Sequence, residues 1–201
     1  LSTRDGQRSE YDGSPVAQLF RLDLPSRRLT RLTAERNGVD APSLDRRTGR
    51  IVYSRRWFNR TRPPGETSDD TVNVWQAISI RADGTDPRLV AKRARATRRE
   101  SLTQPVIARD GSLYGVLGDN AGLSPSPGKT EVVRIRPGSD RAEHVAGAYI
   151  DPTITSRYGS TRGLASPSAC CPMPLDDGRV LFSMDAGARG DWGVWIANAD
   201  G

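Results

Sequence analysis

The stretch PSLDRRTGRIVYS, residues 42–54, decides the fold. It reads as a short strand, a turn that ends at Gly49, and a second strand rich in β-forming residues. The same pattern returns in PVIARDGSLYGV, residues 105–116, and in PMPLDDGRVLFS, residues 172–183. A Thr-Gly or Asp-Gly pair between two apolar segments is a strong hairpin signal, because Gly accepts the positive φ that primed turns need. The sequence therefore predicts three copies of one hairpin.

A third strand is predicted after each hairpin. It reads VWQAISIRADG at 74–84, VVRIRPG at 132–138 and VWIANADG at 194–201, and LFRLDL at 19–24 fits the same place. Residues 28–33 and 87–90 predict a fourth strand. Trp75 and Trp195 each follow a Val in this pattern, so we expect equivalent positions for them, with both rings packed in the core between repeats.

The repeat is long for four short strands. Its turn glycines, Gly49, Gly111 and Gly178, lie 62 and 67 residues apart. The excess falls in segments rich in Gly, Pro, Ser and Thr, which predict exposed loop insertions. These insertions are residues 59–70, 119–129 and 151–169.

Four-stranded units that repeat along a chain predict an all-β fold, a β-propeller of four-stranded antiparallel blades. The blade parts cover about residues 1–33, 40–92, 103–150 and 166–201. The first part begins at a second strand and the last stops after a third, which makes about three and a half blades. Since propellers have about four to eight blades, we expect a piece of a longer polypeptide or a ring that another chain completes. A β-sandwich is the structural alternative, but it does not predict the recurring hairpin.

The charge pattern argues against nucleic acid as a partner. The net charge is +6, with 30 basic side chains that are almost all Arg, spread among Asp and Glu along the chain. The basic segment 91–100 looks helical, but no aromatic residue there offers a stacking platform for bases. Chain-wide, no apolar run of about 18 residues is present, so no membrane span is predicted.

The sequence predicts no catalytic site, cofactor or metal. The single histidine, His144, falls in an outer strand and no Gly-x-Ser-x-Gly motif accompanies it. The pair Asp176-Asp177 suits a turn before Gly178, and Asp69-Asp70 lies in a polar insertion. Cys170 and Cys171 are adjacent and cannot form an ordinary disulfide staple. Two reduced thiols are the expected state, and a vicinal disulfide is the alternative.

One short segment stands out as a candidate partner-binding site. Trp57 lies where a strand runs into an insertion, and arginines flank it. Aromatic and Arg side chains are enriched where protein interfaces hold most of their binding energy. The site comprises Arg55, Arg56, Trp57, Phe58 and Arg60. In the competing interpretation, Trp57 only packs beneath its own loop.

The order of LFRLDL, RLT and APSLD followed by GRIVYS resembles the TolB-type, WD-like propeller repeat. This resemblance implies a non-catalytic scaffold for protein–protein interaction or assembly, in the periplasm or outside the cell. Propellers of this type also serve as accessory domains of peptidases. The Cys170-Cys171-Pro172 hairpin is similar to propeller regions of multi-domain redox proteins resembling hydrazine synthase. In that alternative the chemistry lies in another domain. Inner-strand residues such as Ser43, Val106 and Met173 give no polar cluster for a small ligand.

Overall fold

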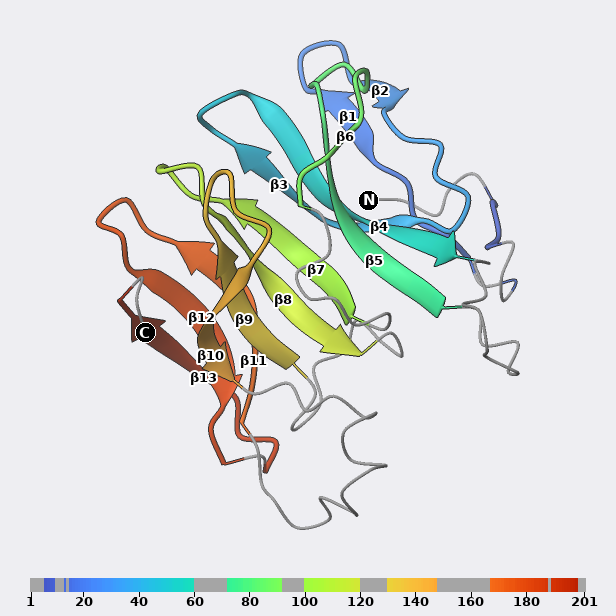
Figure 1. Cartoon of the computed structure of the whole chain (residues 1–201). Helices are drawn as coiled ribbons and strands as arrows, with labels where there is room; N and C mark the ends of the chain where they lie inside the picture. The colour runs from blue at the N-terminus through green and yellow to red at the C-terminus, as the bar shows by residue number, and fades with distance from the viewer. Residues whose placement is uncertain are drawn as a thin grey trace.

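The computed structural model describes residues 6–9, 13, 15–59, 72–91, 100–119, 130–147, 167–187 and 189–198. Within these ranges the chain forms strands and turns and no helix. The strands make four antiparallel sheets that follow one another in chain order (Figure 1). The predicted all-β class and the predicted antiparallel blades are therefore confirmed.

Each sheet is built from strands that are consecutive in the sequence. The first sheet is β1 (Phe20–Asp23) and β2 (Arg28–Arg31). The second is β3 (Val39–Asp45), β4 (Arg50–Asn59), β5 (Val72–Ile80) and β6 (Arg88–Leu89). The third is β7 (Glu100–Ile107), β8 (Leu113–Asp119), β9 (Thr130–Ile135) and β10 (Ala142–Gly147). The fourth is β11 (Ser168–Pro174), β12 (Val180–Asp185) and β13 (Gly193–Ala197).

The three predicted hairpins join the first and second strands of sheets two, three and four. Gly49, Gly111 and Gly178 lie in these turns, with φ angles of 70°, 87° and 88°. The turns are longer than the two-residue primed turns expected from the sequence. In the third sheet, for example, the N–H of Gly111 donates to the carbonyl of Ala108 at 2.9 Å. The glycine is needed because it ends the turn in the left-handed region, as in hairpins of three or more residues.

The first strand of sheets two, three and four carries a β-bulge at a proline, a feature that the sequence did not predict. The strand register shifts between Asp40 and Ser43, between Thr103 and Val106, and between Cys170 and Met173. The residue at the centre of each bulge has a positive φ and precedes a proline. These residues are Ala41 at 48°, Gln104 at 51° and Cys171 at 57°.

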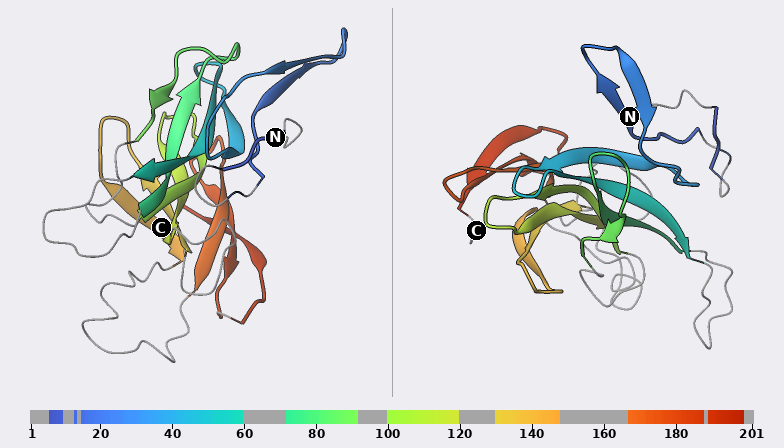
Figure 2. Two further views of the ribbon diagram at one scale, coloured as in Figure 1. Left: turned by 90° about the vertical axis from the view of Figure 1, so that its right-hand side faces the viewer. Right: turned by 90° about the horizontal axis from the view of Figure 1, so that it is seen from above.

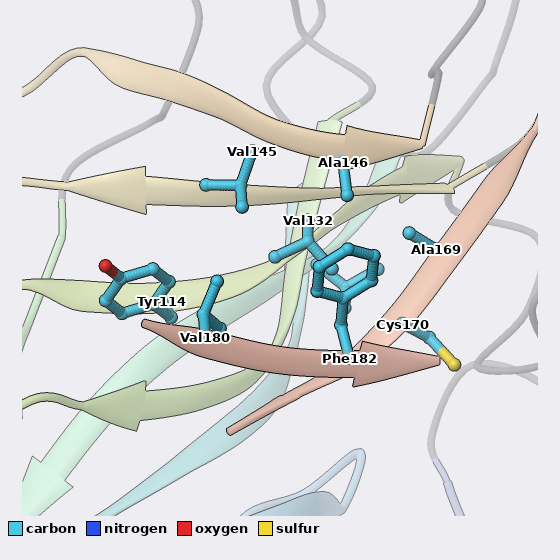
Figure 3. Packing of buried hydrophobic residues seen from close by; sticks show 9 residues of the cluster. Tyr114, Val132, Val145, Ala146, Ala169, Cys170, Val180 and Phe182 are labelled. Atoms are coloured by element: carbon cyan, nitrogen blue, oxygen red, sulfur yellow. The ribbon is translucent and has the colours of Figure 1, made fainter. Parts of the chain in front are cut away.

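Three apolar clusters hold neighbouring sheets together. One joins sheets one and two through residues such as Leu19 and Tyr53. The next joins sheets two and three, where Ala77 meets Leu102 and its neighbours. The last joins sheets three and four, and Figure 3 shows Tyr114, Val132 and Phe182 among its members. Sheet-on-sheet packing in chain order is the arrangement of propeller blades.

The sheets do not close into a ring. The first sheet and the fourth lie at opposite ends of the arrangement in Figures 1 and 2. This is the partial propeller that the strand count predicted. Most of the predicted insertions fall outside the described residues, although Asn59, Asp119 and Ser168 belong to strands. Residues 92–99 of the segment that looked helical also lie outside them, and Glu100 opens β7.

The expectation for Trp75 and Trp195 was wrong. Tyr53 and Phe182 each lie four residues after their turn glycine, and they pair with Ile78 and Trp195 respectively. Trp195 is thus equivalent to Ile78, three positions beyond Trp75. It is 45% exposed, because it sits on the last strand of an end sheet. The two tryptophans had been matched because each follows a Val. Strand register is set by the distance from the turn, and by that measure they are not equivalent.

Candidate interaction site

The predicted partner-binding segment lies in the second half of β4. Arg55 and Trp57 are two residues apart, so they share one face of the strand. The guanidinium carbon of Arg55 lies 4.5 Å from the centroid of the Trp57 ring. Trp57 remains 46% exposed. The structure therefore brings these two predicted residues together as a cation–π pair with an open aromatic face.

Polar contacts from two other elements fix the Arg55 side chain. Its Nη2 donates to Gln76 Oε1 at 2.9 Å, and its Nη1 lies 3.9 Å from Glu35 Oε1. Its Nε is buried without a hydrogen-bond partner in the structure. Because the guanidinium is held from both sides, the stacked Trp57 ring has a preorganised platform beneath it.

The other predicted residues of the segment do not join this pair. Arg56 is half-buried and pairs in register with Trp75 of β5. It lies between Arg55 and Trp57 in the strand, so it does not share their face. The side chain of Phe58 and all of Arg60 lie outside what the structure describes. The described part of the site is therefore Arg55 and Trp57, with Arg56 on the opposite face of the strand.

Beneath this pair lies a buried phenol–carboxylate contact. The Tyr53 hydroxyl donates to Glu35 Oε1 at 3.0 Å, and Tyr53 is 1% exposed. Burial raises the pKa of Tyr53, and the negative charge of Glu35 raises it further. Glu35 thus connects the core of the second sheet to the Arg55 side chain.

A second open surface lies on β13, and sequence reasoning missed it. Val194 and Ile196 flank Trp195 in the strand and are 80% and 47% exposed. Register makes them equivalent to Ala77 and Ser79 of β5, which are 1% and 8% exposed. Ala77 is covered because the next sheet packs on that face.

The third sheet repeats the covered arrangement. Val132 and Arg134 of β9 hold the same positions and are 0% and 7% exposed, with the fourth sheet packed on Val132. The face of β13 is therefore the one that a neighbour covers in both preceding sheets. The sequence signal was available, because VWI at 194–196 is apolar on both faces of a strand.

The inner strands converge on a cleft near their hairpin turns. The cleft has a volume of about 870 Å³, and its lining includes the apolar residues Leu44, Val106 and Met173 and the charged residues Arg47 and Arg109. The Ser43 hydroxyl is already committed to the carbonyl of Pro105, at 2.6 Å. The cleft can contact apolar groups, and the carboxylate of Asp45 in its lining lies 3.7 Å from the guanidinium of Arg47.

The remaining titratable candidates have local roles. His144 Nδ1 lies 3.2 Å from Glu131 Oε2, on the edge strand β10, where its side chain is 56% exposed. Asp177 accepts from the backbone and the guanidinium of Arg179, and these hydrogen bonds lower the pKa of its carboxyl. Asp69 and Asp70 lie outside the described residues. In the ranges that the structure covers, no three His, Cys, Asp or Glu side chains gather as a metal site.

The described chain also holds no helix that is long and apolar enough to cross a membrane.

With the fold and the surfaces established, the molecule is classed as an open arc of antiparallel propeller blades. Among solved structures it is similar to Kuenenia stuttgartiensis hydrazine synthase, with a TM-score of 0.62 and 20% sequence identity. That match covers 96% of this chain and 25% of the other, so the chain spans about a quarter of the length of its structural neighbour. No family model and no curated protein matches the sequence. At this identity the likeness concerns the fold alone.

Proposed function

We propose that this chain is a non-catalytic β-propeller scaffold that mediates protein–protein interaction or assembly within a larger polypeptide or complex. The observation that carries the proposal is the exposure of Val194 and Ile196, at positions that are covered in both preceding sheets. The occupant that fits this face is a further blade, which belongs either to a longer chain or to another chain. An uncovered apolar sheet face would otherwise invite aggregation.

The second contact surface of this scaffold is the Arg55–Trp57 pair. Aromatic and Arg side chains on a rigid strand lose little conformational freedom when a partner binds. Phe58 and Arg60 remain proposed members of the same segment, and Arg56 is proposed to contact a partner from the opposite face of β4. The resemblance to TolB-type repeats supports a periplasmic or extracellular setting for it, which cell fractionation with compartment markers tests.

Carbene footprinting read by mass spectrometry tests the proposed covering of β13. The 201-residue chain is labelled alone, and the native protein is labelled in the assembly isolated from its source. We expect residues 193–197 to be labelled several-fold less in the assembly. Leu89 on β6 is the matched control, because it is 49% exposed and lies on an outer strand. Equal labelling of β13 in the two samples would refute the proposal.

A second candidate function is an accessory propeller domain in a multi-domain enzyme of redox or peptidase type. The likeness to a quarter of a hydrazine synthase chain supports it. The chemistry would then belong to another domain. The sequence of the full-length gene product discriminates the two, because a Cys-x-x-Cys-His or Gly-x-Ser-x-Gly motif outside these residues would favour the enzyme.

A further inference from the structure

The two adjacent cysteines of β11 bring their sulfur atoms together. Cys170 Sγ lies 3.2 Å from Cys171 Sγ. Cys170 is 4% exposed and belongs to the apolar cluster between sheets three and four, whereas Cys171 is exposed. Figure 3 shows the sulfur of Cys170 at the margin of that cluster. The pair therefore has one buried thiol and one that solvent reaches.

This convergence depends on the bulge. In a regular strand neighbouring side chains point to opposite faces of the sheet, so adjacent thiols would be separated by the backbone. The positive φ of Cys171 turns its side chain out of this alternation. Its N–H donates to Gln104 Oε1 at 2.7 Å, and Pro172 fixes the next residue. The thiol pair is thus held by the backbone feature that all three inner strands share.

The spacing favours a bridging atom over a direct bond. A disulfide needs its sulfurs at about 2.05 Å and its Cα atoms at about 4.4–6.8 Å, whereas adjacent Cα atoms are about 3.8 Å apart. If one atom were bonded to both sulfurs at about 2.3 Å, the angle between its two bonds would be roughly a right angle at the observed sulfur–sulfur distance. Tetrahedral zinc requires a wider angle between its bonds to sulfur and two more ligands. In the described ranges no group of three His, Cys, Asp or Glu side chains provides them. Trivalent arsenic and antimony bond pyramidally, at angles near a right angle.

We propose that Cys170 and Cys171 form a chelating dithiol site for a trivalent arsenic or antimony centre. With an arsenoso compound, R–As=O, each thiol gives up its proton, two S–As bonds form and the As=O bond breaks. The oxygen leaves with both protons as water, and no oxidation state changes. No oxidant or reductant is required.

The surroundings set the order of the two steps. Burial, together with the contact with Cys171, raises the pKa of Cys170 to about 12. Because Cys171 is the exposed thiol, it attacks first, and Cys170 closes the ring as its proton passes to the departing oxygen. Gln104, at the same bulge position in β7, stays partly exposed although Cys171 of the fourth sheet contacts it. The position is therefore accessible even when another blade follows.

Titration with phenylarsine oxide, followed by native mass spectrometry, tests the site on the 201-residue chain. We expect one adduct per chain, with the mass of the reagent less one water. Cys171→Ser and Cys170→Ser should each weaken binding at least 100-fold. Far-UV circular dichroism checks that the variants fold, and Cys171→Ser is the safer of the two because Cys171 is exposed. A single-cysteine variant that binds as tightly as wild type would overturn the proposal, and so would the absence of an adduct.

A transplant isolates the role of the bulge. In the Cys170→Ser/Cys171→Ser background, Asp40→Cys/Ala41→Cys places a pair at the equivalent bulge of β3. Arg21→Cys/Leu22→Cys places a matched pair in the regular strand β1, where both residues are exposed. We expect the β3 pair to restore chelation and the β1 pair to bind at least tenfold more weakly. Equal binding by the two pairs would show that adjacency alone suffices, which contradicts the proposed geometry.

Discussion

The side-chain oxygen of Ser54 in β4 accepts a hydrogen bond of 3.0 Å from the backbone N–H of Gln104 in β7. A side chain of the second sheet therefore provides the hydrogen-bond acceptor for an N–H group in the bulge of the third sheet. Ser54 is 0% exposed, so water does not reach this contact from its side. A further side-chain link follows along the chain, because Gln104 accepts in turn from the N–H of Cys171. Bulge N–H groups, which have no partner in their own ladder, are thus used to join neighbouring blades.

Removing the acceptor should destabilise the protein. We expect Ser54→Ala to lower the free energy of unfolding by about 1–3 kcal/mol, because the N–H of Gln104 loses its partner. Ser183 provides the matched control, since it holds the same place beside the bulge of β11 and is only half-buried. We expect Ser183→Ala to change stability by less than about 0.5 kcal/mol. Urea denaturation measures both, and equal losses would contradict the role assigned to Ser54.

Gly147 should tolerate a side chain far less well than Gly138 does. Both have positive φ, at 82° and 78°. A Cβ at Gly147 would lie 2.7 Å from the carbonyl of Thr130 and 2.8 Å from the N of Ala169, whereas none of these contacts exists at Gly138. We expect Gly138→Ala to cost about 1–2 kcal/mol from backbone strain alone, and Gly147→Ala at least twice as much. Thermal unfolding of both variants measures the two losses of stability. Similar losses would mean that β10 can move away from β11 to make room for the side chain.

Tyr53 should make stability fall at high pH. Its pKa is raised in the folded protein by burial and by Glu35. Above about pH 10 the unfolded chain loses this proton while the folded chain keeps it, so stability falls as pH rises toward the folded value. We expect Tyr53→Phe to reduce the loss between pH 8 and 11 in urea titrations, and Glu35→Gln to reduce it in part. An unchanged slope in Tyr53→Phe would assign the pH dependence to other groups.

Local chemistry explains what could be predicted about the fold. Gly49, Gly111 and Gly178 marked the hairpins because a positive φ at the end of a turn is a requirement that the residue itself meets. The alternation of apolar residues then placed the flanking strands. The bulges could not be inferred in this way, because neither Ala41 nor Gln104 favours a positive φ. Packing between neighbouring sheets, such as the hydrogen bond from the N–H of Gln104 to Ser54, holds that conformation.

The candidate site was predictable only in part, for a related reason. Arg55 and Trp57 were predicted from their residue types and their place at a strand end, and their shared face follows from the two-residue period of a strand. The apolar residues on both faces of β13 indicate a strand that can be covered on both sides, but whether another sheet covers Val194 depends on what packs there. The approach of Cys170 and Cys171 depends on a backbone angle that reverses the normal strand alternation. Both features are consequences of packing and backbone conformation, and residue type alone did not reveal them.

The stacked pair on β4 should contribute to partner binding more than to folding. A cation–π contact at a partly exposed site is worth about 0.5–1 kcal/mol, so Trp57→Ala should change stability by no more than about this amount. Recovery of the native assembly with a tagged chain should fall at least tenfold, because a central aromatic anchor would be lost. Arg55→Lys keeps the charge but loses the planar stacking surface, so we expect an intermediate loss. Leu89→Ala removes an equally exposed apolar side chain from β6 and should leave recovery unchanged. Full recovery with Trp57→Ala would show that this surface is not the contact and would leave the open face of β13 as the other surface proposed for it.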